Sequence, residues 1–210
     1  MCGRSSGEPI GDLCTDDVDA VIVAVSDDAI SEVLRQVNPG NALWIHTAGS
    51  VAIDAIPFER RGVIYPLQTM LKDKEPDWSN LPLFIEGEDP LIEELARTMS
   101  PNVKPLDSRQ RCQLHASAVL SCNLVMHLWS EAERLLGENG LDFALLHPLM
   151  CQTLQRAMSG SPSEAMTGPA RRGDVGTLRK HLEALPDDLK PTYELLSNQI
   201  LKKYHPELSI

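Results

Sequence analysis

Apolar residues follow one another almost without interruption at positions 19–25, in the segment DAVIVAV. A run of this kind, rich in β-branched residues, is typical of a parallel strand that is buried on both faces of a sheet. The apolar residues at 30, 33, 34 and 37 then follow the spacing of one helical face. A second apolar run covers 42–46. Strand, helix and strand in this order predict a βαβ unit with a right-handed crossover.

Three shorter apolar segments continue the strand pattern, and they predict strands at 62–65, 83–86 and 103–106. The helical spacing at 90–99 predicts a helix between the last two. Strands that alternate with helices are typical of an α/β fold with a parallel or mostly parallel sheet and helices on its faces. We therefore expect residues 1–106 to form a nucleotide-binding-type domain.

The pattern changes to a helical period after residue 107, and one long helix is predicted over 108–136. Its stretch 114–129 contains no Asp, Glu, Lys or Arg. A helix that is apolar nearly all round is usually buried, so this one is expected to be central. Further helices are predicted at 142–158, 174–185 and 189–204. We expect residues 107–210 to form an all-helical domain, which should dimerise because about 100 residues can scarcely bury such a stretch alone.

Composition excludes several classes of function. The chain has 19 Lys and Arg against 30 Asp and Glu, a net charge of -11 that would repel a nucleic-acid backbone. No apolar run reaches membrane-spanning length, and the N-terminus has no signal-peptide pattern. The five cysteines form no CxxC pair and are interpreted as free thiols of a reducing compartment. We expect a cytoplasmic protein that binds neither nucleic acid nor membranes.

Ligands of open α/β sheets bind beyond the carboxyl ends of the strands, and small polar residues occupy these places here. Ordinary strand-to-helix turns would use similar residues, so both interpretations stay open. The candidates after the first two strands are Val25, Ser26 and Asp27, and then Thr47, Ala48, Gly49 and Ser50. Tyr65, Gln68 and Thr69 follow the third strand, where a Pro-directed turn is the alternative.

The N-terminal residues Arg4, Ser5 and Ser6 suggest a second part of a cofactor site. An arginine followed by hydroxyl groups after a strand would suit a ribose 2′-phosphate. A ragged N-terminus without a ligand is the alternative.

The long helix carries His115, Asn123 and His127 within roughly a third of its circumference. A polar stripe on an apolar helix must find partners or face a cleft. These residues are therefore either hydrogen-bonded residues of a core or an interface, or residues that line a site. Imidazoles suit acid–base chemistry near neutral pH, which makes His115 the candidate acid or base. No compact ligand motif favours a metal.

A polar loop in the last third of the chain, Thr167-Gly168-Pro169-Ala170-Arg171-Arg172-Gly173-Asp174, ends in an aspartate suited to cap a helix. Thr167 and either Arg171 or Arg172 could contact an anionic substrate. Simple solvent exposure of the arginines is the alternative.

Five segments of the chain together resemble a known family: VIVAVSDDAI, HTAGSV, GVIYPLQT, RQRCQLHASAVLSCNLVMHL and MTGPARRGD. It comprises Rossmann-like candidate NADP oxidoreductases with a C-terminal helical domain of unknown function. The resemblance implies a fold like those of ketopantoate reductase and the 6-phosphogluconate and β-hydroxyacid dehydrogenases. It also implies NADP as cofactor and a small carbonyl, hydroxyl or imine substrate in the interdomain cleft. Gly49 and Ser50 would line the nicotinamide side, and Gln68 and Asn123 would orient the substrate.

The sequence departs from this family at its start. The family begins with a strand, a G-x-G-x-x-G turn and a helix, whereas Gly3, Gly7 and Gly11 do not have that spacing. The chain as written would therefore begin near the end of the second strand, with an incomplete Rossmann-like sheet, and is expected to bind NADP(H) weakly. The alternative function is a non-catalytic dimerising or ligand-sensing module that has lost cofactor binding.

Overall fold

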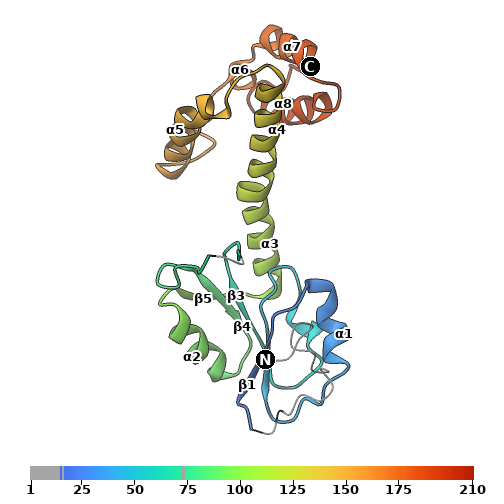
Figure 1. Cartoon of the computed structure of the whole chain (residues 1–210), viewed down its shortest axis with the longest axis vertical. Helices are drawn as coiled ribbons and strands as arrows, with labels where there is room; N and C mark the ends of the chain where they lie inside the picture. Colours follow the sequence, from blue (N-terminus) through green and yellow to red (C-terminus); the bar gives the residue numbers. More distant parts are fainter. Residues whose placement is uncertain (1–14, 16, 72–73) are drawn as a thin grey trace. The chain divides into compact units, whose positions relative to one another are not determined.

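The computed structural model describes Thr15 and residues 17–71 and 74–210 (Figure 1). Contacts within the chain separate two compact units, Met1–Glu131 and Ala132–Ile210. The predicted domain boundary after residue 106 stays a prediction. The cofactor candidates Arg4, Ser5 and Ser6 lie outside the described residues.

The first unit is built on a five-stranded sheet with the order β1-β2-β3-β4-β5. Its strands are β1 (Ala20–Val23), β2 (Leu43–His46), β3 (Arg61–Pro66), β4 (Leu83–Glu86) and β5 (Val103–Pro105). All neighbouring strands are parallel except β3 and β4, which are antiparallel. The sheet confirms the predicted α/β fold. The reversed direction of β4 was not predicted, because strand direction does not alter the apolar pattern of a buried strand.

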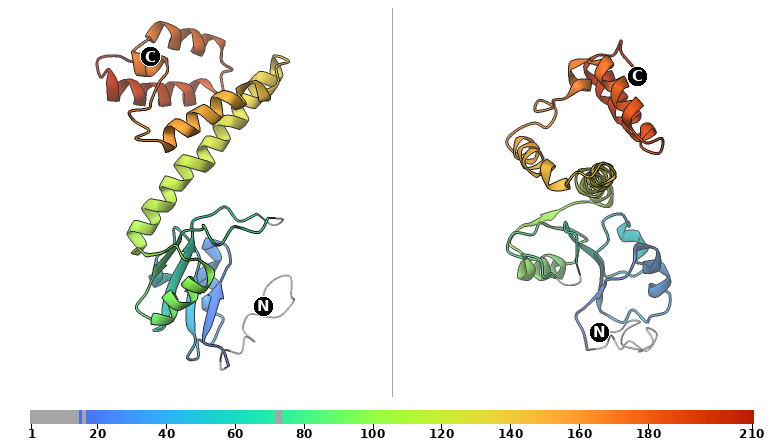
Figure 2. Two further views of the ribbon diagram at one scale, coloured as in Figure 1. Left: turned by 90° about the vertical axis from the view of Figure 1, so that its left-hand side faces the viewer. Right: turned by 45° about the horizontal axis from the view of Figure 1, so that its top comes forward.

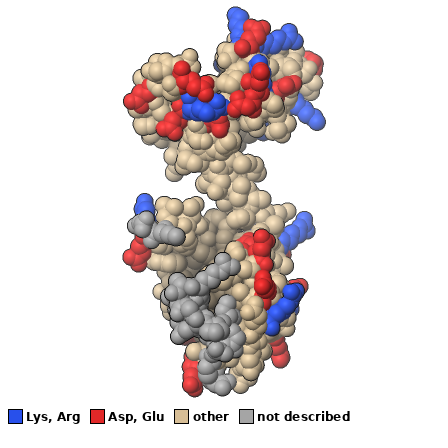
Figure 3. Space-filling view, turned by 45° about the vertical axis from the view of Figure 1, so that its right-hand side comes forward, with Lys and Arg blue, Asp and Glu red and all other residues tan. Residues whose placement is uncertain are grey.

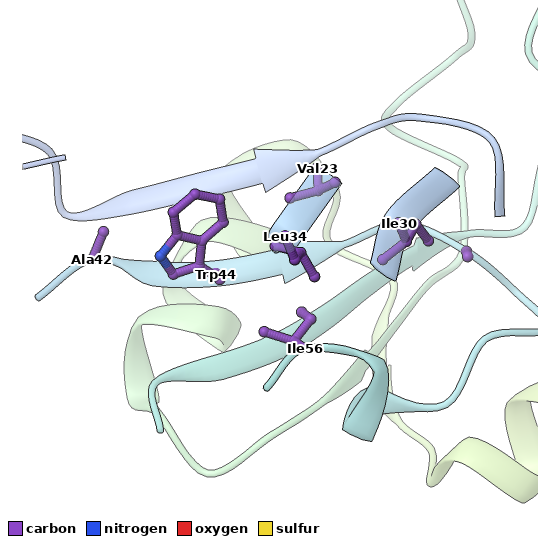
Figure 4. Packing of buried hydrophobic residues seen from close by; sticks show 7 residues of the cluster. Val23, Ile30, Leu34, Ala42, Trp44 and Ile56 are labelled. Carbon is purple, nitrogen blue, oxygen red and sulfur yellow. The ribbon is translucent and has the colours of Figure 1, made fainter. Parts of the chain in front are cut away.

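Helices cover both faces of the sheet, and the residues of β2 alternate between them. On one face Trp44 packs with Ile30 and Leu34 of α1 (Ile30–Leu34), as Figure 4 shows. The 3-10 turn η2 (Asp27–Ala29) precedes α1, and η3 (Ile53–Ala55) follows β2. On the other face Leu43 and Ile45 pack with Ile92 and Ala96 of α2 (Pro90–Met99).

One continuous helical segment follows the sheet (Figure 2). It consists of α3 (Ser108–Ala118), the π-helical turn η4 (Val119–Asn123) and α4 (Leu124–Glu138). Asp107 and Gln110 form a capping box at its start, where the Asp107 carboxylate accepts from the Gln110 N–H at 2.7 Å. The predicted long helix is therefore present. The π turn within it was not predicted from the sequence.

The uncharged stretch of this helix is not buried, contrary to the prediction. Leu120 is 64% exposed, and Leu124, Met126 and Leu128 are exposed as well. In Figure 3 the chain shows charged side chains on both units, but this stretch carries none. An apolar helix is buried only where other elements cover its whole circumference, and within the described part of this single chain they do not.

The second unit contains short helices around a small core. They are η5 (Phe143–Leu146), α5 (His147–Met158), α6 (Pro169–Arg172), α7 (Val175–Ala184) and α8 (Lys190–Tyr204). Ala170, Leu178 and Leu201 form the buried cluster that joins α6, α7 and α8. The short helix α6 lies where a loop was predicted. No helix among the described residues is long and apolar enough to cross a membrane.

Candidate functional site

The loops after β1 and β2 meet at the carboxyl edge of the sheet. The hydroxyl of Ser50 donates a hydrogen bond of 2.6 Å to the Asp27 carboxylate, and it joins the two loops directly. Val25, Ser26, Asp27 and Ser50 are exposed there. Thr47 is partly exposed, whereas Ala48 and Gly49 are buried. The structure thus brings together the polar strand-end residues that the sequence singled out, with their polar groups open to a ligand.

A hydrogen-bonded pair lies beside these loops. Tyr65, near the end of β3, and His115, on α3, are joined by a bond of 3.0 Å between the phenol oxygen and Nδ1. Their rings meet edge to face at a centroid distance of 5.9 Å. Burial raises the pKa of Tyr65 above its usual 10.0, opposed by Arg111 and assisted by Asp27. The phenol therefore stays protonated and can donate a hydrogen bond over the physiological pH range.

Gly49 makes this pairing sterically possible. A Cβ atom at position 49 would lie 2.7 Å from Nδ1 of His115 and 2.9 Å from the ring of Tyr65. Both distances are shorter than real Cβ contacts, so any side chain would displace one of the two rings. The loop after β2 thus approaches the pair closely only because residue 49 is glycine.

A buried ion pair fixes the start of α3 against the sheet. Arg111 is 1% exposed, and its guanidinium binds the Glu86 carboxylate at the end of β4. The same guanidinium donates to the carbonyls of Ala48, at 3.2 Å, and Val51. Ser108 donates its N–H and its hydroxyl to Glu86, at 2.9 and 2.8 Å. Because His115 follows Arg111 by one helical turn, this network sets its position beside the loop.

Sequence reasoning missed Arg111 and Glu86. An arginine near the start of a helix and a glutamate at the end of a strand are ordinary surface residues in sequence terms. The available signal was weak: Arg111 is the last charged residue before the uncharged stretch of the long helix.

His46 is a second buried polar residue of the same region. It is fully buried, and its Nδ1 accepts a hydrogen bond of 3.2 Å from the N–H of Ala48. Its Nε2 has no hydrogen-bond partner among the described residues. Burial, assisted by the positive charge of Arg111, lowers the pKa of His46 to about 4. His46 and Arg111 thus hold the N–H and the carbonyl of Ala48, directly before Gly49.

A cavity of about 750 Å³ opens next to the Tyr65–His115 pair. Five of the candidate residues line it: Tyr65, Gln68, Thr69, His115 and Asn123. Leu114, Ala118 and Val119 supply apolar surface. The π turn contributes Val119, Ser121, Cys122 and Asn123, and π turns often occur at functional sites. The cavity thus combines a hydrogen-bonded phenol and imidazole, amides and hydroxyls with an apolar wall.

Three other candidates do not line this cavity. His127 is 62% exposed, with its Nδ1 3.9 Å from the carboxylate of Glu131, and it does not line the cavity. Thr167 and Arg171 belong to the unit Ala132–Ile210 and line a separate cavity there. Within the described part of the chain, no group of three or more His, Cys, Asp or Glu residues is arranged to hold a metal ion.

The geometry can be compared with known proteins. A family model described as "Domain of unknown function (DUF2520)" matches residues 81–200, which is more than half of the chain. The chain belongs to the DUF2520 family. The match covers β4, Glu86 and the whole helix that carries Arg111, His115 and Asn123, and it ends within α8.

Solved structures extend the likeness beyond the residues of the DUF2520 match. A protein of Bacteroides fragilis described as a candidate NADP oxidoreductase is 34% identical, with a TM-score of 0.81, over 91% of this chain and 78% of its own. A protein of Thermotoga maritima is 21% identical, with a TM-score of 0.73, over 90% and 80%, and it shares the fold. No curated protein matches the chain.

Proposed function

We propose that the chain is an NADP-dependent oxidoreductase that acts on a small carbonyl, hydroxyl or imine substrate in the cavity beside Tyr65 and His115. One observation carries the proposal: a hydrogen-bonded phenol and imidazole line a cavity of about 750 Å³ at the carboxyl edge of a Rossmann-like sheet. This edge is where such folds bind ligands. The Bacteroides fragilis relative, described as a candidate NADP oxidoreductase, supports the choice of reaction class and cofactor.

The strand-end residues fit one end of a nicotinamide cofactor. Ser26, Thr47 and Ser50 offer hydroxyl groups, and the exposed carboxylate of Asp27 can accept hydrogen bonds from a ribose. A carboxylate repels phosphate, so these residues suit the ribose and nicotinamide rather than the phosphates. When bound, the cofactor supplies or accepts the hydride. Arg4, Ser5 and Ser6 remain the candidates for the 2′-phosphate.

The Tyr65–His115 pair can supply the proton that balances the hydride. In the reductive direction the Tyr65 phenol gives its proton to the substrate oxygen or nitrogen, and a proton on Nδ1 of His115 passes to the phenol oxygen. In the oxidative direction both protons move the opposite way. The raised pKa of Tyr65 holds its proton in place until the substrate develops negative charge.

Three polar groups of the cavity can orient the substrate. They are the amides of Gln68 and Asn123 and the hydroxyl of Thr69. Each can donate a hydrogen bond to a polar substituent of the substrate or accept one from it. The apolar wall around Val119 offers a surface on which the apolar part of the substrate can pack. These contacts favour a small molecule with one reducible group and at least one further polar group.

The test is NADPH oxidation by the full chain with a panel of small carbonyl and imine compounds, at cofactor concentrations up to saturation. His115→Ala should lower kcat by about two to four orders of magnitude, the usual range for a lost general acid or base. The matched control is His127→Ala, which alters an exposed histidine of the same helix and should leave kcat nearly unchanged. Equal rates for the wild type and His115→Ala would contradict the proposal. Failure to bind NADPH or to turn over any compound would favour a non-catalytic ligand-sensing or dimerising module.

A further inference from the structure

A second cavity, of about 460 Å³, lies within the unit Ala132–Ile210. The segment before α6, the helix α6 itself and the residue after α8 line this open hollow. Its lining residues are Met166, Thr167, Gly168, Arg171, Arg172 and His205. Two arginines, a histidine and a hydroxyl group thus share one hollow in a chain whose net charge is -11. This concentration of donors requires a physical explanation, because the proposed oxidoreductase site does not use it.

The side chain of Arg171 stacks on one aromatic ring, and its backbone is held by a histidine. The carbon of its guanidinium lies 4.1 Å from the centre of the Tyr204 ring, and the Tyr204 hydroxyl donates a hydrogen bond of 2.6 Å to the carbonyl of Ser163. Nε2 of His205 lies 3.0 Å from the Arg171 carbonyl and binds it. Stacking occupies the flat face of the guanidinium and leaves its edge, where the N–H donors are, for another partner.

No carboxylate of the described chain takes up this edge. Neither Arg171 nor Arg172 has a carboxylate oxygen within 4.0 Å in the part of the chain that the structure describes. Arg134 of the same unit, by contrast, pairs with Asp188 at 2.7 Å. The edge of the Arg171 guanidinium is therefore available for charge-assisted hydrogen bonds to an anion.

Two acidic groups lie close to the cavity. Hydrogen bonds from Thr177 and, to a lesser extent, the charges of Arg172 and Lys180 lower the pKa of one of them, Asp174. The carboxylate of Asp174 accepts from the N–H and the hydroxyl of Thr177, at 3.0 and 2.7 Å. Glu207 lies 3.9 Å from Nδ1 of His205, on the other ring nitrogen from the one that binds Arg171. Lys203 adds a further positive charge 5.4 Å from the Tyr204 ring. Asp174 thus acts on Arg172, and Glu207 lies beside His205, whereas the guanidinium of Arg171 has no carboxylate oxygen within 4.0 Å among the described residues.

We propose that this cavity binds the anionic group, a carboxylate or a phosphate, of a small ligand. Arg171 contacts two oxygens of the anion with the edge of its guanidinium, and Arg172 and the hydroxyl of Thr167 bind the remaining oxygens. The anion belongs to a free small molecule, since the candidates for the 2′-phosphate of NADP are Arg4, Ser5 and Ser6 in the other unit. The site does not depend on catalysis, and it stands or falls separately from the oxidoreductase proposal.

The experiment is calorimetric titration of the full chain with inorganic phosphate and with malonate, at constant ionic strength set with sodium chloride. The wild type should bind at least one of the two anions saturably. Arg171→Gln should weaken binding by about tenfold or more, because it removes charge-assisted hydrogen bonds. Arg171→Lys keeps the charge but loses the planar fork and should give an intermediate affinity. Arg179→Gln is the matched control, since Arg179 is an exposed arginine of the same unit that does not line the cavity.

Competition identifies the source of the anion. Displacement of phosphate by NADP⁺ but not by NAD⁺ would overturn the assignment to a free small anion, because it would place a 2′-phosphate in this cavity. Displacement by neither would support it as a site for a free small anion. Equal anion affinities of the wild type, Arg171→Gln and Arg171→Lys would overturn the proposal, as would the absence of saturable binding of phosphate and malonate to the wild type. Circular dichroism of each variant checks that the helical unit stays folded.

Discussion

The two units of the chain differ in what they bury. The sheet of the first unit has an apolar cluster on each face, and its interior also encloses polar side chains such as His46 and Arg111. The second unit has one cluster, formed by Ala170, Leu178 and Leu201. On its surface α5 exposes Leu149, Leu154 and Met158, the last to 78%.

The two units therefore differ in whether their structure calls for a second molecule. The first unit fixes the candidate site by interactions within its own interior, so the geometry of Tyr65, His115 and Gly49 needs no other molecule. The helical part leaves apolar surface that water solvates poorly, which is typical of surfaces that another protein covers. The homodimer predicted from the sequence remains our proposal for what covers it.

The largest effect is expected from Arg111→Met, which leaves the Glu86 carboxylate without its partner. Breaking a buried ion pair in this way costs about 3–5 kcal/mol of unfolding free energy. Chemical denaturation followed by circular dichroism measures it. Arg109→Met, an exposed neighbour on the same helix, is the control and should change stability by less than about 0.5 kcal/mol. Similar values for the two variants would show that the network does not stabilise the first unit.

A pH-dependent effect is expected at His46. Its pKa is about 4 in the folded chain, whereas the unfolded chain has the usual value of 6.5. Between these pH values the unfolded chain therefore binds a proton that the folded chain does not. This contribution to stability is therefore complete above pH 6.5 and is lost as the pH falls towards 4, by about 3 kcal/mol in total. His46→Asn keeps an acceptor for the Ala48 N–H and does not titrate. The stability advantage of the wild type over this variant should shrink by that amount on acidification, and a constant difference would contradict the assignment.

Gly49→Ala should cost about 1–3 kcal/mol, because the new methyl group meets the rings of His115 and Tyr65. It should also lower any NADPH-dependent activity by separating the pair. Gly137→Ala is the matched control in the other unit, since a Cβ there has no neighbour within 4 Å. Within a helix this exchange should stabilise by about 0.5–1 kcal/mol. In thermal unfolding, Tm should fall for Gly49→Ala and rise for Gly137→Ala relative to the wild type. A shift of both Tm values in the same direction would argue against close packing at Gly49.

The smallest effect on the fold is expected from Met126→Glu. Met126 is exposed on α4 within the uncharged stretch, so a charge there should leave the unfolding of the single chain nearly unchanged. If this face joins two copies, the charge must be buried on association and the dimer should dissociate. Analytical ultracentrifugation of the wild type and the variant tests this. If the wild type is a monomer at micromolar concentrations, the proposed homodimer is wrong.

The sequence predicted most of the elements because their signals are local. The bounds of β4 and α2 agree with the predictions, since an apolar run defines the first and Asp89 and Pro90 mark the start of the second. The π turn at Val119–Asn123 has no such local signal. The four-residue helix α6 was also missed, because its residues are those of a turn. Neither the order nor the direction of the strands follows from their patterns.

The site shows the same division. Tyr65, Gln68, His115 and Asn123 were each singled out by residue type and position, and the structure gathers them in one cavity. The bond between Tyr65 and His115 joins residues 50 positions apart, and the contact of Arg111 with Glu86 spans 25. Contacts at such separations depend on tertiary packing and leave no periodic trace in one sequence. The burial that shifts the pKa of His46 is equally a property of the packed sheet.

The most direct test of the central claim is a double-mutant cycle on Tyr65 and His115 in NADPH-dependent turnover. If the two residues act as one proton-transfer pair, Tyr65→Phe and His115→Ala should each lower kcat by about two to four orders of magnitude. The double variant should then be little slower than the slower single variant, because either change already disables the pair. Losses that multiply in the double variant, or single variants with wild-type kcat, would contradict the claim that Tyr65 and His115 work together.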